Sequence, residues 1–384
     1  MNKFYVFLSA LLVSASAMAA SPVALVYVQP TVEQYAPAPV YVYAAASNGE
    51  LTQVKGSSVT LPQIVGTNGT HFITVDNTPG APYLRSYDLA SDGLIGKEVS
   101  SVNLATWSWW GGTAELDHTG QSVYVYTTRG DYSLLNLSLS KSGDLKFQGI
   151  ANAYEPGLPT ITGNNKFAYG FNNYCADGGN GCDCGSPDTF VALNRESNGS
   201  LEGIAFSETD PIAPGAPGSG NQYYPEGAVT NDPTNHLAVV VSVFNGGCQA
   251  NYNNQIASYT VGSQGDLVST NTWENMPTLP PNDNPTSIVL DPAGTVLAVT
   301  TGTGIQFFHF NGAKPITPFT GVIGTSGYIT TMAWDKDNHL YAINGASGKL
   351  HVYEATTTSV KEVSGSPYNN VCGQTTCTLV VRAD

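Results

Sequence analysis

Aromatic and acidic side chains recur in short clusters just ahead of apolar segments of this chain. Aromatic rings can stack on a sugar or another planar ligand, while carboxylate, amide and hydroxyl groups bind its polar edge. Packing between neighbouring loops is the alternative role for the same rings. The candidate ligand-binding residues are Trp107, Trp109, Trp110, Tyr154, Tyr223, Tyr224, Asp283, Asn284 and Tyr328, with Tyr368 at an equivalent position.

Two carboxylates in these clusters could carry acid or base chemistry. Glu155 and Glu226 are the candidate pair, and Arg129 could hold a substrate carboxylate. The chain contains no G-x-S-x-G or H-E-x-x-H pattern and no Rossmann or P-loop glycine motif. We therefore expect no cofactor, and a hydrolytic activity would depend on these three side chains.

Six cysteines indicate disulfide chemistry in an exported chain. Cys372 and Cys377 are close in sequence and are expected to pair, whereas the pairing of Cys175, Cys182, Cys184 and Cys248 stays open. A zinc site in this loop lacks histidine and a second CxxC. We expect a merely polar loop and no metal there, and calcium held by oxygen ligands is the alternative. The candidate calcium ligands are Asp177, Asn180, Asp183 and Asp188.

The first residues have the pattern of a secretory signal peptide. Lys3 is followed by an apolar stretch over residues 4–13 and by Ala17-Met18-Ala19, a typical cleavage pattern. A buried N-terminal strand is the alternative. We expect a signal peptide at 1–19, one domain at 20–384, no membrane span, and a secreted or periplasmic location.

Composition limits the fold and the partners. The chain has 384 residues, 14 Lys+Arg against 29 Asp+Glu, and a net charge of -15, which argues against nucleic-acid binding. Only 11% of residues are charged, too few for the exposed faces of a long helical bundle. The 41 glycines, 23 prolines and 21 tyrosines favour a turn-rich all-β fold.

Two sequence patterns alternate at intervals of about fifty residues. One is an Asp- or Asn-containing turn followed by an apolar strand, beginning near residues 66, 117, 163, 232, 291 and 335. The other is a strand, a glycine turn and a second strand; its turn glycines are Gly49, Gly93, Gly143, Gly199, Gly265 and Gly312. Together they predict a four-stranded meander, A to D, repeated as the blades of a propeller. Unrelated hairpins in a sandwich are the alternative.

The two chain ends together supply one blade. Residues 23–54 contain strands B, C and D without an A strand, and residues 377–382 form a lone strand. We therefore predict a seven-bladed β-propeller closed by the C-terminal strand joining the N-terminal blade, which removes an open sheet edge. A Cys372–Cys377 bridge would brace this closing strand.

The order of a D-x-x-G turn, a YVY-like strand and an S-Y-x-x-x-x-x-G-x-L segment resembles the lactonase-type propellers, which include 6-phosphogluconolactonase and the carboxymuconate cyclases. The resemblance spans essentially the whole mature chain. It implies a lactone hydrolase or cyclase, whose relatives use His, Arg and Glu near the channel. The corresponding Gly-Pro-Arg-His-like segment reads here Tyr224-Pro225-Glu226-Gly227, so its Arg and His are missing.

The topology places the longest loops and the aromatic clusters at one mouth of the channel. His71, His118, His236 and His339 fall in or beside turns at the opposite mouth. We therefore expect an exported binding or interaction module, whose partner is a small molecule, a glycan or another protein. The acidic mouth predicts a neutral or cationic, sugar-like ligand.

Overall fold

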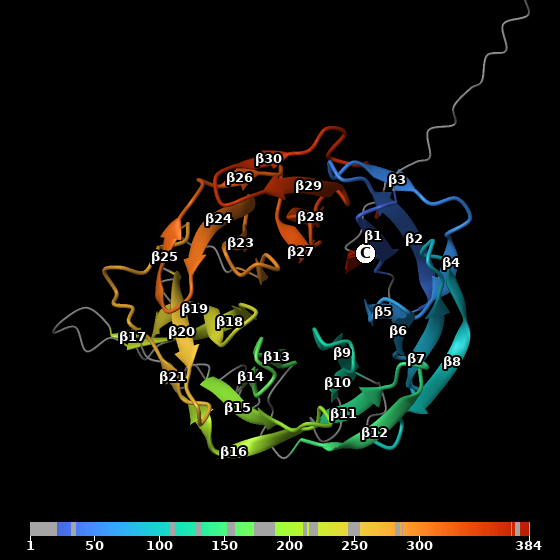
Figure 1. Ribbon diagram of the computed structural model, residues 1–384, viewed down its shortest axis with the longest axis horizontal. Coiled ribbons are helices and arrows are strands. Elements are labelled where there is room, and N and C mark those ends of the chain that lie inside the picture. Colours follow the sequence, from blue (N-terminus) through green and yellow to red (C-terminus); the bar gives the residue numbers. More distant parts are fainter. Residues whose placement is uncertain are drawn as a thin grey trace, which may run out of the picture.

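The computed structural model describes residues 21–31, 36–107, 112–127, 133–151, 158–172, 189–209, 213–214, 222–244, 254–280, 285, 287–369, 371–372 and 377–383. Within these ranges all regular secondary structure is β, and the strands form seven antiparallel sheets. The sheets stand as blades around a central opening (Figure 1). The predicted seven-bladed β-propeller is confirmed.

Each blade orders strands A to D from the opening outward. Blade 1 contains β31 (Cys377–Ala383), β1 (Ala24–Pro30), β2 (Ala38–Ala45) and β3 (Leu51–Gln53), with β4 (Val59–Leu61) also paired to β2. Blade 2 contains β5 (Gln63–Thr67), β6 (His71–Asp76), β7 (Tyr83–Leu89) and β8 (Ile95–Asn103). Blade 3 contains β9 (Gly112–Leu116), β10 (Ser122–Thr127), β11 (Leu134–Leu139) and β12 (Leu145–Ile150). Blade 4 contains β13 (Thr160–Ile161), β14 (Phe167–Asn172), β15 (Thr189–Arg195) and β16 (Leu201–Thr209).

The remaining blades follow the same order. Blade 5 contains β18 (Gln222–Asn231), β19 (His236–Phe244), β20 (Gln255–Val261) and β21 (Leu267–Val268), with β17 (Ala213–Pro214) paired to β18. Blade 6 contains β22 (Ile288–Leu290), β23 (Val296–Thr301), β24 (Gly304–Asn311) and β25 (Lys314–Pro318), with β26 (Ile323–Gly324) paired to β24. Blade 7 contains β27 (Ile329–Trp334), β28 (His339–Asn344), β29 (Leu350–Ala355) and β30 (Val360–Glu362).

The hydrophobic core is divided among the interfaces between blades. Each of the seven apolar clusters in the described residues lies between two neighbouring blades. Because side chains alternate across a strand, one B strand serves two interfaces. In β1, Leu25 and Tyr27 pack toward blade 2, whereas Val26 and Val28 pack toward blade 7. This double burial explains why the B strands are almost continuously apolar.

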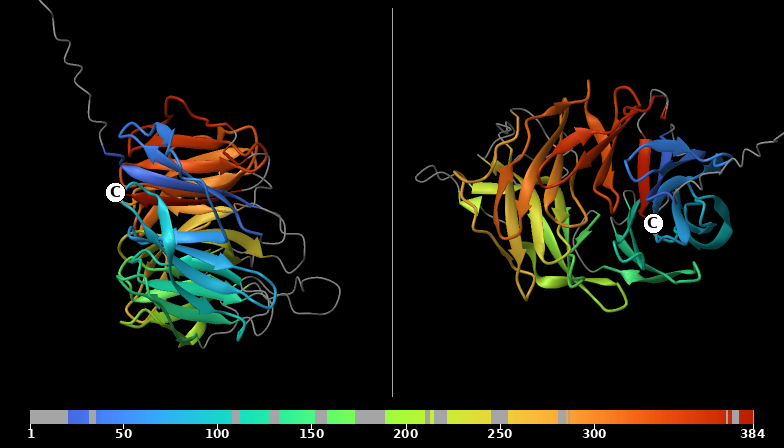
Figure 2. Two further views of the ribbon diagram at one scale, coloured as in Figure 1. Left: turned by 90° about the vertical axis from the view of Figure 1, so that its right-hand side faces the viewer. Right: turned by 45° about the horizontal axis from the view of Figure 1, so that its top comes forward.

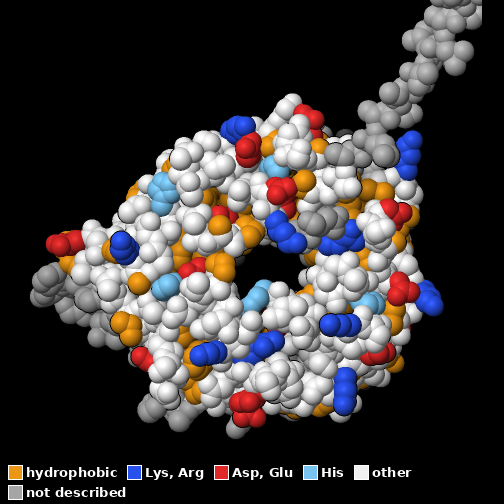
Figure 3. All heavy atoms as spheres, in the orientation of Figure 1, with side chains coloured by type: hydrophobic (Ala, Val, Ile, Leu, Met, Phe, Trp, Pro, Cys, Tyr) orange, Lys and Arg blue, Asp and Glu red, His pale blue; other side chains and the backbone are white. Residues whose placement is uncertain are grey.

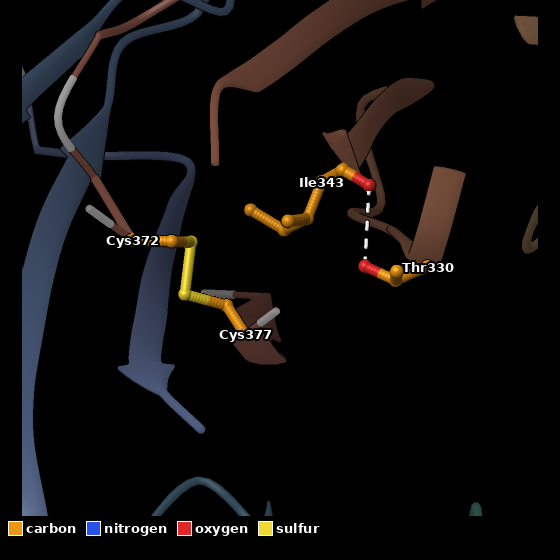
Figure 4. The surroundings of a disulfide bond; sticks show 4 residues. All are labelled: Thr330, Ile343, Cys372 and Cys377. Carbon is orange, nitrogen blue, oxygen red and sulfur yellow. Dashed lines mark hydrogen bonds between the residues drawn. A yellow bond between two sulfur atoms is a disulfide. The ribbon is translucent and has the colours of Figure 1, made fainter. Parts of the chain in front are cut away.

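The chain ends close the ring. β31 pairs antiparallel with β1 from Ala24↔Ala383 to Pro30↔Cys377, as predicted. Cys372 and Cys377 form a disulfide with a Cα–Cα distance of 5.8 Å, which confirms the predicted pair. Figure 4 shows this bond beside Ile343 of blade 7, whose carbonyl oxygen accepts a hydrogen bond from Thr330 at 3.3 Å. The disulfide thus packs in the cluster between blades 1 and 7.

The strands run between two faces of the ring, as the side view in Figure 2 shows. One face, here the turn face, carries the A–B and C–D turns. The other, here the loop face, carries the B–C and D–A connections.

The C–D turns join neighbouring blades on the turn face. In blade 2, Gly93 has φ +88°, and a Cβ built on it would lie 2.7 Å from Leu25 Cδ1 of blade 1. Only glycine tolerates both this conformation and this contact. Tyrosine hydroxyls strengthen three of these joints by donating to turn-glycine carbonyl oxygens: Tyr27 to Gly93 (3.3 Å), Tyr124 to Gly199 (2.7 Å) and Tyr169 to Gly265 (2.6 Å).

On the loop face, several D–A connections fold back onto strand C. This pairing occurs at β4 with β2, at β26 with β24, and at the bridges Gln255↔Thr278 and Leu350↔Tyr368. Just before such a connection pairs with strand C, one of its side chains accepts a hydrogen bond from a backbone N–H group of that strand. Ser57 accepts this bond from Val42, and Ser366 accepts it from Val352. The D–A connections of these blades are therefore hydrogen-bonded parts of the sheet.

Candidate functional site

The structure describes part of the predicted aromatic mouth. Tyr224 and Glu226 lie in β18, where only their backbone is described. The other predicted residues without a description are Trp109, Trp110, Arg129, Tyr154, Glu155, Cys175, Asp177, Asn180, Cys182, Asp183, Cys184, Asp188, Cys248, Asp283 and Asn284. Their predicted roles stay predictions.

Three of the described aromatic residues pack within or between blades. Trp107 stacks on Phe147 with ring centroids 4.3 Å apart. Tyr223 is buried in the cluster between blades 4 and 5, and burial raises the pKa of its hydroxyl. The Tyr368 hydroxyl of blade 7 accepts a hydrogen bond from the Leu51 N–H of blade 1 at 2.8 Å. Packing is thus the observed role of these three rings.

Tyr328 differs because 48% of it is exposed. It precedes β27, so it stands on the loop face where the innermost strand of blade 7 begins. A Cβ built on Gly345 would touch the Tyr328 ring and the methyl group of Thr330. The ring therefore lies against the backbone at Gly345, where glycine has no side chain. Nearly half of Tyr328 stays open to solvent.

The backbone beneath Tyr328 is held by a buried amide. Asn344 is fully buried, and its Nδ2 donates to the Thr325 carbonyl oxygen at 2.7 Å. Its Oδ1 accepts the N–H groups of Ala346 and Ser347 at 3.0 and 2.9 Å. Because one buried side chain fixes both segments, Tyr328 is presented on a rigid support. We call this arrangement the Tyr328 platform.

Most of the histidines have structural contacts. His71, His236 and His339 each begin a B strand and pack against turn glycines of the next blade, namely Gly143, Gly312 and Gly49. His309 stacks on Phe319 at 4.2 Å, and His351 binds the Glu362 carboxylate at 2.8 Å. His118 is exposed in the A–B turn of blade 3. The sequence pattern predicted that these histidines lie on the turn face. It did not predict their contacts with glycine, because each glycine belongs to the neighbouring blade.

The described arginines also make contacts within or between blades. Arg195 of blade 4 forms an ion pair with the buried Asp117 of blade 3 at 2.7 Å. Arg382 of β31 donates to the carbonyl oxygens of Ala90 and Ser91 in blade 2 at 2.9 and 2.8 Å. Arg85 pairs with Glu98 at 2.9 Å on the exposed edge of blade 2.

Asp335 and His339 form a buried pair in the A–B turn of blade 7. His339 Nδ1 lies 2.8 Å from Asp335 Oδ2, which also accepts the Tyr341 hydroxyl at 2.8 Å. Burial alone would lower the pKa of His339, but the hydrogen bond and charge of Asp335 outweigh it and raise this pKa. Burial would raise the pKa of Asp335, yet its hydrogen bonds lower it. Both shifts favour the charged pair.

A cavity of about 480 Å³ opens on the turn face, at the inner strands of three adjacent blades. Its walls comprise residues 379–382 of β31, residues 65–69 from β5 and its turn, residues 116–120 from β9 and its turn, and Lys336 of blade 7. Figure 3 looks onto this face and shows basic and histidine side chains around the central opening. No local sequence pattern marks this cavity, because strand ends from opposite ends of the chain form it.

Two titratable groups near this cavity have shifted pKa values. Desolvation, with the charge of Asp117, raises the pKa of Glu115 of β9 to about 7, although Glu115 is one of the exposed residues of that strand. Desolvation lowers the pKa of His118, despite the opposing charge of Asp117. Near neutral pH the imidazole of His118 is therefore mostly uncharged.

Within the described ranges, no group of three or more His, Cys, Asp or Glu side chains could hold a metal ion. The described part of the chain also has no helix long and apolar enough to cross a membrane. The Cys372–Cys377 disulfide is compatible with an extracellular location.

No protein-family model matches this sequence, and no curated protein matches it. Solved structures do match its fold. A "putative 6-phosphogluconolactonase" from Bacteroides fragilis aligns with a TM-score of 0.59 and 11% identity, over 94% of this chain and 97% of that chain. A second "putative 6-phosphogluconolactonase", from Bacteroides uniformis, aligns with a TM-score of 0.57 and 14% identity, over 93% of this chain and 100% of that chain.

A functionally unknown protein from Desulfotomaculum acetoxidans also matches, with a TM-score of 0.57 and 15% identity over 92% of this chain and 98% of that chain. The resemblance to lactonase-type propellers is therefore confirmed at the level of the fold. At these identities the likeness concerns architecture and leaves the activity open.

Proposed function

We propose that this protein is a binding propeller whose loop face takes up a neutral, sugar-like ligand. The Tyr328 platform carries this proposal, because it presents an exposed aromatic ring on a rigid support at the inner end of blade 7. A sugar can stack its apolar face on such a ring while its hydroxyl groups bind nearby polar groups. Trp109, Trp110, Tyr154, Tyr224, Asp283 and Asn284 are the proposed further contacts.

The charge distribution supports a neutral ligand at this face. The chain carries a net charge of -15, and the described arginines bind carboxylates or backbone carbonyl groups within and between blades. An anionic ligand would approach against the long-range field of the protein. The turn-face position of His71, His118, His236 and His339 likewise supports binding over histidine-dependent catalysis on the loop face.

A lactone hydrolase or cyclase is the alternative. It is favoured by the fold shared with the two Bacteroides proteins, each described as a "putative 6-phosphogluconolactonase". Glu155 or Glu226 would act as the base, and Arg129 would hold a carboxylate. The two proposals differ in a measurable way, because only the enzyme consumes its ligand.

Calorimetric titration with a panel of neutral oligosaccharides tests the binding proposal. Tyr328→Ala should weaken the best neutral binder about tenfold, equivalent to about 1.4 kcal/mol, because the stacking surface is lost. Tyr328→Phe keeps the ring and should retain most of the affinity. Trp273→Ala is the matched control, since Trp273 is also exposed and lies in the D–A connection of blade 5.

Three outcomes would contradict this proposal. The first is an affinity that Tyr328→Ala leaves unchanged. The second is a larger loss in Trp273→Ala than in Tyr328→Ala. The third is tight binding of a phosphorylated or polycarboxylate ligand with every neutral glycan inert.

A further inference from the structure

The backbone beside the Tyr328 platform is strained at Ser326. Within the described ranges, three residues other than glycine have a positive φ: Asn165 (60°), Ser326 (59°) and Asn338 (65°). Asparagine tolerates this left-handed conformation better than serine does. The two asparagines lie in A–B turns on the turn face, whereas Ser326 lies on the loop face, two residues before Tyr328. Ser326 is therefore the one residue of the three whose type does not suit its backbone.

The neighbours of Ser326 impose this conformation. The Thr325 N–H donates to the Thr303 carbonyl oxygen of blade 6 at 3.0 Å, and the Thr325 carbonyl oxygen accepts Asn344 Nδ2 at 2.7 Å. The Thr325 hydroxyl donates to the Gly327 carbonyl oxygen at 2.7 Å. Because both flanking residues are held, residue 326 has to take a left-handed φ. Glycine at this position would form the same turn with less strain.

The Ser326 side chain does not support the fold. It is exposed, and it makes no hydrogen bond with any other residue that the structure describes. The contacts of Thr325 and Gly327 explain the backbone conformation, but they do not explain why the residue is serine. Strained residues are typical of ligand sites, where the side chain has a role outside the fold. The hydroxyl group of Ser326 is therefore available to a ligand.

The position of Ser326 relative to Tyr328 indicates which ligand group its hydroxyl would meet. The Cα atoms of residues two apart are separated by at most about 7.6 Å. A sugar stacked on the exposed Tyr328 ring carries its hydroxyl groups around its edge, within reach of such a neighbour. A serine hydroxyl can donate to a sugar hydroxyl and accept from one.

We propose that Ser326 is a specificity-determining residue of the Tyr328 platform, and that its hydroxyl binds one ring hydroxyl of a sugar stacked on Tyr328. This inference rests on the binding function proposed above and adds a polar contact to it. A sugar that lacks this ring hydroxyl should bind more weakly to the unchanged protein, and Ser326→Ala should bind both sugars alike.

Calorimetric titration with cellotetraose, maltotetraose and chitotetraose tests the role of Ser326, using the tightest binder of the three. Ser326→Ala keeps the strained backbone and loses the hydroxyl. It should weaken binding about fivefold, the effect of one neutral hydrogen bond, with an unchanged Tm. Ser326→Gly should weaken binding equally but raise the Tm by about 1–2 °C, because the strain is relieved. A serine needed only for the fold would give a lower Tm in both variants.

Asn338→Gly is the matched control, because Asn338 has nearly the same φ but lies in a turn-face turn of the same blade. It should bind the chosen tetrasaccharide within twofold of the unchanged protein. If Tyr328→Ala weakens binding and Ser326→Ala does not, this inference fails and the proposed function stands. A lower Tm in both Ser326 variants also overturns the inference. If none of the three tetrasaccharides binds, or Tyr328→Ala has no effect, both proposals fail.

Discussion

At the residue scale, His339 shows how a side chain suited to chemistry serves the fold. Its ring binds Asp335 at 2.8 Å, and its side chain is 2% exposed. Gly49 of blade 1 packs directly against the ring. A histidine directly after a D-x-x-N turn, as in Asp335 to His339, could be taken for an acid–base group. Here its position at the start of a B strand makes it part of a joint between blades.

The raised pKa of His339 predicts a pH-dependent contribution to stability. Because the folded protein binds this proton more tightly than the unfolded chain, the contribution is complete below the ordinary value of 6.5 and falls as pH rises through the raised pKa. The lowered pKa of Asp335 adds stability above its ordinary value of 3.8, which is lost as pH falls through the lowered pKa. Both contributions are present near pH 5.5.

His339→Asn should therefore lower the free energy of unfolding by about 2 kcal/mol at pH 5.5 and by less at pH 9. Urea unfolding at the two pH values measures this difference. His309→Asn is the control, because the His309 ring stacks on Phe319 rather than binding a carboxylate. A loss for His339→Asn that is equal at both pH values would contradict the account.

At the element scale, the C–D turn is the recurring link between blades. Gly93→Ala should destabilise the protein by at least 2 kcal/mol, because the new Cβ would overlap Leu25 Cδ1 in a left-handed turn. Gly56 is the matched control: its φ is +75°, and a Cβ there meets nothing within 4 Å. Gly56→Ala should cost about 1 kcal/mol from backbone strain alone. Equal losses in chemical unfolding would show that the interblade contact contributes nothing.

The order of these elements could be predicted because each blade repeats local signals. Strand B is apolar on both sides, and glycine marks the C–D turn, so both patterns are visible in one segment of sequence. The joints could not be predicted in the same way. The glycine that accepts the Tyr169 hydroxyl is Gly265, in the next blade, and no local spacing relates the two.

The pairing of D–A connections with strand C was also not predicted, although two of these connections share a sequence pattern. Val54-Lys55-Gly56-Ser57 and Val363-Ser364-Gly365-Ser366 share a Val-x-Gly-Ser pattern. In both, the serine accepts a hydrogen bond from the middle of strand C, at Val42 and Val352 respectively. Two copies in adjacent blades are too few to stand out without the structure.

At the scale of the whole molecule, closure depends on the last strand. The lone strand at residues 377–382 could be assigned from sequence because the first blade lacked an A strand. The proposed loop-face site could be predicted only as a set of candidate residues, since loop conformation depends on contacts that sequence periodicity does not encode. The turn-face cavity depends on β31 meeting β5 and β9, which only the closed ring provides.

Breaking the disulfide should weaken this closure without abolishing it. Replacing both Cys372 and Cys377 by Ser should lower stability by about 2 kcal/mol, the chain-entropy value for so small a loop. A chain ending at residue 371 should lose much more, because it exposes the whole edge of β1 that pairs with β31. Thermal unfolding compares the three proteins. A truncated chain as stable as the double-serine variant would contradict the assigned closure.

The central claim, that this propeller binds a neutral ligand without converting it, is tested most directly with a neutral 1,4-aldonolactone. This probe is both sugar-like and hydrolysable, so one titration followed by NMR reports its binding and its chemical fate together. The account predicts saturable shifts that Tyr328→Ala weakens, with the lactone ring opening no faster than in buffer. Ring opening that rises in proportion to protein concentration and is abolished by Glu226→Gln would contradict it and establish the enzyme.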